Sequence, residues 1–273
     1  MRDTSFTYRP LDAKGWRMAM GLRPLDPATW LEVDDRRDEE LALKRELLAT
    51  RYEVVVRSQP AGDAPSAELF EEITRFLARE HPTLTLEPSG GEHPVVAAAR
   101  LVQEDLCVMV RRDQWRLAAA CVCFPSRWEL AEKIGRTLDE IHGPVPLYAS
   151  RLASPTLAFF DRLGPERAFW RLNWTLLDDA ALHQPSSPRR APEGGLERWH
   201  FRVERQTLRR LERTGAVVFT IRTYVASAEE LCARYDDFAS ELLHSLETAP
   251  DEVLDYKGWR GLAPRLRAQL EDQ

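Results

Sequence analysis

Two adjacent apolar segments in the middle of the chain limit the possible folds more than any other part of it. LCVMV (Leu106 to Val110) and WRLAAACVCF (Trp115 to Phe124) flank the polar tetrapeptide Arg111 to Gln114, a spacing typical of a β-hairpin. Apart from Arg116, the second segment is apolar at both alternating sets of positions, as expected for a strand that is covered on each face. A chain with such a strand must place other elements on both sides of a sheet.

Three later segments alternate as strands do and bring the predicted sheet to about five strands. Trp170 to Leu176 alternates between large apolar and polar residues. Trp199 to Leu211 begins with strand alternation and is expected to pass into a helix, and Ala216 to Val225 is the last strong strand. We therefore predict an α+β fold, an antiparallel sheet with helices packed on it. The polar face of the first of these strands carries Arg171, Asn173 and Thr175.

The segments outside this sheet are predicted to be an arm, helices and loops. An extended arm at Gly21 to Asp35 precedes amphipathic helices at about Glu39 to Ala49 and Ala67 to Arg79, with a surface loop at Arg57 to Ser66. Asp178 to Gly195 is rich in Pro, Ser and Gly and is expected to be a mobile loop or lid. We expect a single domain over 1–273, with an N-terminal arm and helices in 1–95, the sheet core in 96–225 and a helical tail in 226–273.

Two capping signals and a proline-rich loop follow the hairpin. Ser126 stands three residues before Glu129, and Thr137 three residues before Glu140, which is the spacing of a capping box, so a helix is expected after each. His142 lies near the end of the second helix on its apolar face. A glycine and two prolines then end that helix and fix the path of the chain.

His142 has two interpretations that its spacing leaves open. It is either a buried histidine bonded to backbone, helping to cap its own helix, or a metal ligand presented to an apolar slot, as the proximal ligand of a haem is. The other five histidines lie in loops, in the tail or on an exposed strand face.

Charged residues beside buried strand positions form a second candidate cluster, made of Arg202, Glu204, Arg205, Arg222 and Tyr224. In one interpretation these residues form a solvated sheet surface. In the other, the arginines bind carboxylates such as haem propionates, and Glu204 or Tyr224 binds a cationic substrate or moves its proton. Arg222 stands out because the residues on both sides of it are typical of a buried strand.

The cysteines offer no metal-binding pattern. The chain has four, Cys107, Cys121, Cys123 and Cys232, and none forms a CxxC pair. Cys121 and Cys123 are two apart, so on a strand they share a face as small apolar residues. We expect buried reduced thiols and neither a zinc site, a disulfide nor an iron–sulfur cluster in this chain.

Charge and motifs exclude several functional classes. A net charge of −6 and a pI of about 5.7 give no field that attracts nucleic acid or anionic lipid, so neither is an expected partner. The apolar runs are far shorter than the ~20 residues of a membrane span, and the N-terminus lacks the apolar core of a signal peptide, so we expect a cytoplasmic protein. There is no nucleotide-binding loop, serine-hydrolase elbow or HExxH zinc motif. If the chain does redox chemistry, its electrons come from elsewhere.

An ordered set of segments resembles the haem-dependent oxidative N-demethylase family. The segments lie between Gly21 and Val225 and read GLRPLDPATWL, LVQEDLCVMV, CFPSRWELAEKIGRTLDEIHGPVPLY, FWRLNW and RVERQTLRRLERTGAVVFTIRTY. The PSRW…EK.G…IH.PVP block is the most specific of them. The resemblance implies a PAS-like domain that carries haem b, with His142, the histidine of this block, on the iron. The further candidates are Arg127, Lys133 and Arg205 for haem binding and Glu204, Arg222 and Tyr224 for catalysis.

The resemblance also implies a reaction. A secondary amine such as dimethylamine would be converted with O₂ into a primary amine and formaldehyde, with electrons from a partner reductase that holds flavin and a [2Fe–2S] centre. Two alternatives are a PAS-like haem or small-ligand sensor without turnover, and a non-catalytic subunit that has lost the cofactor. The sequence shows no kinase, DNA-binding or coiled-coil output segment, which favours an enzyme over a sensor. It leaves the oligomeric state open.

Overall fold

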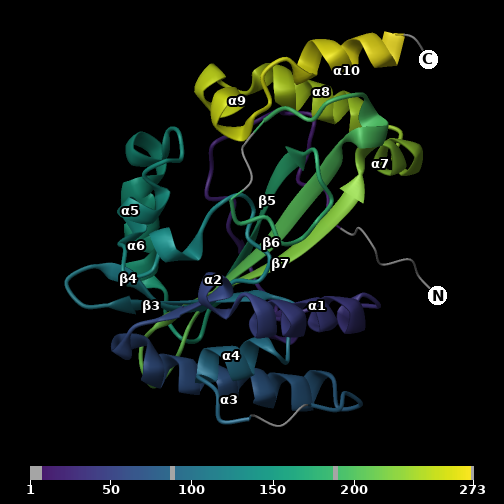
Figure 1. Ribbon diagram of the computed structural model, residues 1–273. Helices are drawn as coiled ribbons and strands as arrows, with labels where there is room; N and C mark the ends of the chain where they lie inside the picture. Colours follow the sequence, from purple (N-terminus) through teal and green to yellow (C-terminus); the bar gives the residue numbers. More distant parts are fainter. Residues whose placement is uncertain (1–7, 87–89, 187–189, 272–273) are drawn as a thin grey trace.

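The centre of the protein is an antiparallel sheet, seen in a computed structural model that describes residues 8–86, 90–186 and 190–271 (Figure 1). Within these residues the sheet has seven strands in the order β1-β5-β6-β7-β3-β4-β2. The strands are β1 (Arg23–Pro24), β2 (Val56–Ser58), β3 (Asp105–Arg111), β4 (Trp115–Cys121), β5 (Ala168–Leu177), β6 (His200–Arg210) and β7 (Val217–Ser227).

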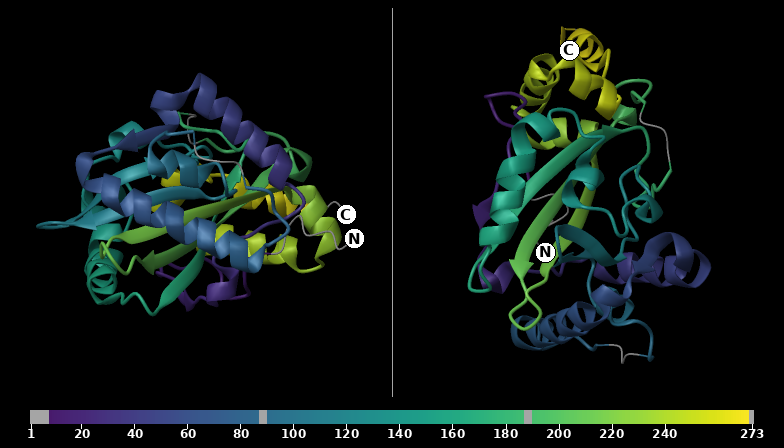
Figure 2. Two further views of the ribbon diagram at one scale, coloured as in Figure 1. Left: turned by 90° about the horizontal axis from the view of Figure 1, so that it is seen from below. Right: turned by 90° about the vertical axis from the view of Figure 1, so that its left-hand side faces the viewer.

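Helices surround the sheet in three groups. In Figure 1, α1, α3 and α4 lie below it, α5 and α6 to its left, and the C-terminal helices above it. Figure 2 shows the C-terminal helices and α3 at opposite ends of the long strands. In the described part of the chain the α-helices are α1 (Arg37–Thr50), α2 (Tyr52–Val55), α3 (Asp63–Glu80), α4 (Pro94–Ala99), α5 (Leu138–His142), α6 (Ala153–Arg162), α7 (Ala228–Arg234), α8 (Phe238–Thr248), α9 (Asp251–Lys257) and α10 (Leu262–Glu271).

The α+β class and the hairpin are confirmed. β3 and β4 pair with Arg111 opposite Trp115, and β4 is buried along its length except at Arg116, which is half-buried. Leu25 and Trp30 of the N-terminal arm are buried as well, so the arm lies over the core as the sequence predicts. In the described residues no helix is both long and apolar enough to cross a membrane.

The expected PAS-like sheet of about five strands is wrong, because seven strands form an open sheet. The two additional strands, β1 and β2, are two and three residues long, too short to show an alternating pattern. β2 and a 3-10 turn at Pro60–Gly62 occupy a segment predicted to be surface loop. Gly62 permits this, because a Cβ there would lie 2.7 Å from the Cβ of Ala119 on β4.

Two local expectations in the second half of the chain are also wrong. The segment Trp199 to Leu211 does not pass into a helix, because β6 continues to Arg210 between two long partners, β5 and β7. This pairing outweighs the helical propensity of the segment. Nor does Ser126 cap a helix: it pairs with Gln184, and only a 3-10 turn at Leu130–Glu132 follows.

The predicted lid at Asp178 to Gly195 is anchored at its start. Gln184 is buried and pairs with Ser126, and the side chain of Leu182 is also buried. Asp178 accepts hydrogen bonds from Arg127 and Arg190. Residues 187–189 of this segment lie outside the described residues, so the prediction of mobility is not tested there.

The cysteines pack as small side chains among the described residues. Cys107, Cys121 and Cys123 are buried and Cys232 is half-buried, and all four are free thiols. The sulfur atoms of Cys121 and Cys123 are 4.0 Å apart, which confirms that the two side chains point the same way. Burial raises the pKa of the Cys107 thiol, so this group stays protonated at neutral pH.

The two faces of the sheet are covered by different elements. On the first, which we call the α5 face, Leu138 of α5 and Phe160 of α6 pack with Leu208 and Val217 of the sheet. On the second, the α1 face, the N-terminal arm, α1, α3 and α4 pack at one end and the C-terminal helices at the other. Strand residues alternate between these faces, so their register decides which of them meet.

The stability of the protein is expected to depend on the buried Asp105 carboxylate. Asp105 accepts hydrogen bonds from the backbone N–H groups of Cys123 (2.7 Å) and Phe124 (2.8 Å). Burial nevertheless raises the pKa of Asp105 to about 6, although Lys44 and these bonds oppose the shift. The folded protein therefore binds more protons than the unfolded chain, where the pKa is about 3.9.

The resulting stabilisation is complete below about pH 4 and is lost as the pH rises through about 6, because the buried Asp105 carboxyl then becomes charged. We expect a loss of roughly 3 kcal/mol over this window, at ~1.4 kcal/mol for each unit of pKa shift. Urea unfolding of wild type and Asp105→Asn between pH 4.5 and 7.5 measures this loss of unfolding free energy. Asparagine does not ionise, so the variant should lack the loss. Parallel pH profiles for the two proteins would contradict this role of Asp105.

Candidate active site on the α5 face

His142 is held at the end of α5 by contacts on every side. The predicted capping box forms: the Thr137 hydroxyl accepts from the N–H of Glu140, and the Glu140 carboxylate accepts from the N–H of Thr137. At the other end of the helix, Lys133 Nζ donates to the carbonyl of Ile141 at 2.9 Å. The ring of Tyr148 stacks on the imidazole, with centroids 4.6 Å apart and planes 16° apart. The imidazole therefore has a fixed position.

The protonation state of His142 follows from these contacts. Its Nδ1 lies 2.8 Å from the carbonyl oxygen of Leu138, and a carbonyl only accepts, so Nδ1 carries the proton. Burial lowers the pKa of His142, and Arg171 and Lys133 lower it further, while the bond to Leu138 opposes the shift. The neutral imidazole therefore presents the lone pair of Nε2, which is the form that binds a metal ion.

Arg171 of β5 lies on the α5 face, within electrostatic range of His142. Its Nε is buried and has no hydrogen-bond partner among the described residues. Burial lowers the pKa of Arg171, and Glu204 of β6 opposes the shift. A guanidinium with an unused donor can form a charge-assisted hydrogen bond to a carboxylate or another anion.

Glu204 is the carboxylate of this face. It accepts from Asn173 Nδ2 at 3.2 Å and from Gln206 Nε2 at 2.9 Å, and Arg202 Nε lies 3.7 Å away. Its side chain is only 11% exposed. Glu204 acts to raise the pKa of Arg171, and Arg171 acts to lower the pKa of His142. The three side chains therefore form one electrostatic cluster.

Strand β5 is less buried than its neighbour β6. Its residues from Ala168 to Thr175 are all half-buried, whereas nearly all of β6 from Phe201 to Leu208 is buried. Apolar side chains border the polar row, among them Leu138, Ile141, Leu157, Phe159 and Phe169. The α5 face thus combines an apolar surface, one free imidazole nitrogen and several buried guanidinium Nε atoms without a hydrogen-bond partner among the described residues, that of Arg171 among them.

The other predicted haem-binding residues lie partly here. Lys133 holds the end of α5, as described above, so it acts on His142 through the backbone. Arg127 has a left-handed backbone (φ 59°) and binds Asp178 and Gln184 of the neighbouring loop. It is also close enough to Arg202 to lower the pKa of that residue, after the larger effect of burial.

Arg205, Arg222 and Tyr224 lie on the α1 face, across the sheet from His142. Arg205 donates to the carbonyls of Thr29 and Trp30, and Arg222 pairs with Asp34 and Glu40. The hydroxyl of Tyr224 donates to Glu32 at 2.6 Å. These partners belong to the N-terminal arm and α1, so the structure does not bring the three residues to the candidate site.

Arg171, Asn173 and Gln206 were not predicted as site residues. The signal for two of them was present, because the alternation of β5 predicts a polar face that carries Arg171 and Asn173. What was missing was the register: Arg171 stands opposite Gln206, and Asn173 opposite Glu204. Only this pairing connects the polar row of β5 with the acid of β6.

The fold and the cluster define an α+β protein with a histidine prepared to bind a metal-containing group on one face of its sheet. Residues 21–266 match the family described as haem-dependent oxidative N-demethylase, alpha subunit-like. The match covers most of the chain, and the chain belongs to this family. The family description indicates haem-dependent oxidative N-demethylation.

The residues of the α5 face fit a haem. The iron of a haem needs one fixed nitrogen, and the neutral imidazole of His142 has a nitrogen that could bind it. The macrocycle needs apolar contacts, and its propionates need donors, which the unpaired Nε of Arg171 supplies. No group of three or more His, Cys, Asp or Glu residues in the described part of the chain is arranged to hold a bare metal ion.

Proposed function

We propose that the α5 face binds haem with His142 on the iron, and that the protein demethylates a small secondary amine oxidatively. The observation that supports this most is the state of His142, a neutral imidazole whose Nδ1–H is bonded to backbone and whose Nε2 is free to bind. It lies in a member of a haem-dependent family, beside apolar side chains and an unpaired guanidinium.

Each residue of the cluster has a role in this proposal. His142 binds the iron, and Arg171 binds a propionate through Nε. Glu204, which accepts hydrogen bonds from Asn173 and Gln206, attracts the ammonium form of the amine and accepts its proton. Of the candidate residues across the sheet, Arg205 remains a prediction for haem binding, and Arg222 and Tyr224 remain predictions for catalysis; their partners lie in the N-terminal arm and α1.

When bound, haem supplies the iron at which O₂ is activated, and dimethylamine, O₂, two electrons and two protons give methylamine, formaldehyde and water. The electrons come from a separate reductase with flavin and a [2Fe–2S] centre. The description of the family as alpha subunit-like supports a partner of this kind.

Formaldehyde release tests the proposal. Haem-loaded protein, dimethylamine and O₂ with a chemical reductant or a reductase should release formaldehyde in proportion to the amine consumed. If the protein binds haem but releases no formaldehyde from any small secondary amine, the result would contradict the proposed demethylase activity and favour a haem sensor.

Glu204→Gln is expected to lower kcat/KM for the amine by about a hundredfold or more, the usual range for removing an acid–base group. Glutamine keeps an oxygen for the bonds from Asn173 and Gln206 but has no charge for the ammonium group. The matched control is Glu212→Gln, since Glu212 is exposed in the turn between β6 and β7. Steady-state formaldehyde assays measure both variants, and an unchanged kcat/KM in Glu204→Gln would remove Glu204 from the mechanism.

A further inference from the structure

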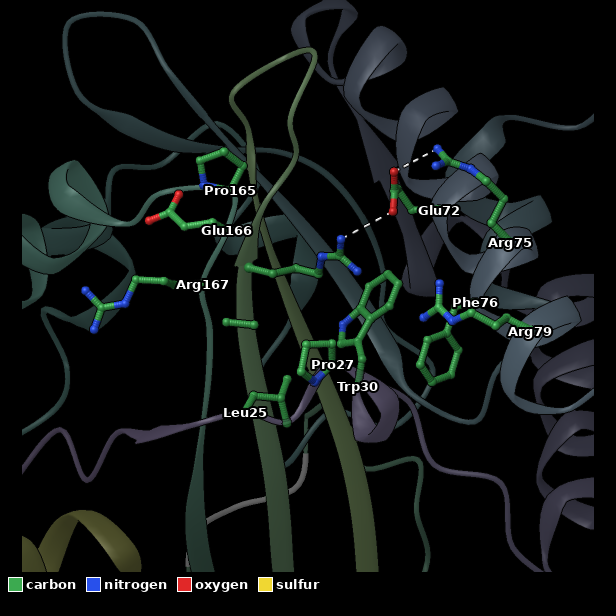
Figure 3. Close-up of a pocket in the computed structure, with 12 residues that line it drawn as sticks. Leu25, Pro27, Trp30, Glu72, Arg75, Phe76, Arg79, Pro165, Glu166 and Arg167 are labelled. Atoms are coloured by element: carbon green, nitrogen blue, oxygen red, sulfur yellow. Dashed lines mark hydrogen bonds and ion pairs between the residues drawn. The ribbon is translucent and has the colours of Figure 1, made fainter.

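A cavity of about 260 Å³ lies on the α1 face, away from His142 (Figure 3). Its wall comes from three parts of the chain: the N-terminal arm, α3, and the start of β5 with the end of β6. Ala168 and Arg209 stand opposite each other in the β5–β6 register, and the alternation of β6 places Arg209 on the face that carries Arg205. The sheet therefore separates this cavity from the candidate active site.

The inner part of the cavity is apolar. The arm contributes Leu25, Pro27 and Trp30, and α3 contributes Phe76. The rings of Trp30 and Phe76 meet edge to face, with centroids 5.6 Å apart. The volume lies just below that of pockets for drug-sized ligands, ~300 to 1,000 Å³, so a smaller organic molecule fits.

Arginines surround this apolar part. Glu72 of α3 accepts from Arg75 at 2.7 Å and from Arg209 at 3.3 Å, as the dashed lines in Figure 3 show. The guanidinium of Arg209 lies 4.1 Å above the Trp30 ring. Arg79, one turn beyond Arg75, points to the same region, whereas Glu166 and Arg167 point away from it in Figure 3.

Positive charge exceeds negative charge in this group. The guanidinium groups of Arg75, Arg79 and Arg209 lie near one carboxylate, that of Glu72. Glu80, outside the cavity, pairs with Arg79 at 2.6 Å, and with it counted there are still three positive charges to two negative ones. Burial lowers the pKa of Arg209, Glu72 opposes this, and Arg75 and Arg79 lower it further. An anion near the three arginines would relieve their mutual repulsion.

We propose that this cavity binds a small organic anion, a carboxylate or phosphate monoester on an apolar body. The charged group would bind Arg75 and Arg79. The apolar body would lie against the exposed Pro27 and would reach the Phe76 ring, 3% exposed, where Arg79, 5.9 Å from its centroid, turns to the ligand. Arg75 and Arg79 are 63% and 62% exposed, so they are free to turn toward a ligand without disturbing the core.

Isothermal titration of the full chain tests the proposal with phenyl phosphate, benzoate, inorganic phosphate and benzylammonium as probes. Phenyl phosphate or benzoate should bind saturably and at least about tenfold more tightly than inorganic phosphate, a difference of ~1.4 kcal/mol. Benzylammonium should not bind. No saturable binding of either aromatic anion, equal binding of inorganic phosphate, or equal binding of the cation would each overturn the proposal.

The double variant Arg75→Gln/Arg79→Gln locates the site. It should weaken binding of the aromatic anions at least about tenfold, since two charge-assisted contacts are lost. The matched control, Arg112→Gln/Arg198→Gln, removes the same charge at exposed positions outside the cavity and should bind as wild type does. Equal affinities in the two double variants would overturn the assignment to this cavity.

Discussion

Replacing Arg222 with methionine is expected to lower the free energy of unfolding by about 3–5 kcal/mol, the effect of removing one partner from a buried ion pair. Arg222 is fully buried on the α1 face, where its two terminal nitrogens lie 2.6 Å from Asp34 and 2.7 Å from Glu40. The variant leaves the Glu40 carboxylate, 2% exposed, with only the more distant Arg36 at 3.9 Å and the hydrogen bond from Gln103 at 2.9 Å.

The electrostatics of this group support the size of the effect. Burial acts to lower the pKa of Arg222, but Glu40, Tyr224 and Asp34 outweigh it and the pKa is raised. Burial raises the pKa of Glu40 even with Arg222 beside it, so without Arg222 this carboxylate is expected to take up a proton.

Chemical denaturation of wild type and variant measures the change. Arg260→Met is the matched control, because Arg260 pairs with Asp255 at the surface, where such pairs contribute little. If the two variants unfold at the same denaturant concentration, the contacts of Arg222 do not hold the N-terminal arm to the sheet.

The candidate site shows how one wrong local prediction affects others. Glu204 and Arg205 are neighbours in sequence, and on a strand neighbours point to opposite faces. A helix beginning near Glu204 would remove this alternation, and the sequence pattern therefore predicts both residues in one cluster. β6 is a strand throughout, so Glu204 faces α5 and Arg205 faces the arm.

The features that sequence did predict are local ones. The β3–β4 hairpin and the Thr137–Glu140 capping box depend on residues a few positions apart, and both form. Strands β1 and β2 exist only because distant strands offer them an edge, so no local pattern reports them. The cavity at Trp30 likewise joins segments from three regions of the chain.

His142→Ala is expected to remove the iron ligand and to weaken haem binding by more than about a hundredfold. Losing a residue that only hydrogen-bonds to a metal ligand typically costs about 10- to 100-fold, and losing the ligand itself should cost more. Alanine leaves α5 intact, because the capping box and the Lys133 bond do not use the imidazole. His200→Ala is the control, since His200 is a half-buried histidine at the start of β6 and lies in no contact with α5.

Titration of the purified chain with haemin, followed by absorption in the Soret region, tests the assignment of His142 most directly. We expect wild type and His200→Ala to bind one haem with the same spectrum, and His142→Ala to lose or shift the Soret band. A spectrum and affinity in His142→Ala equal to those of wild type would contradict a haem held by His142 on the α5 face.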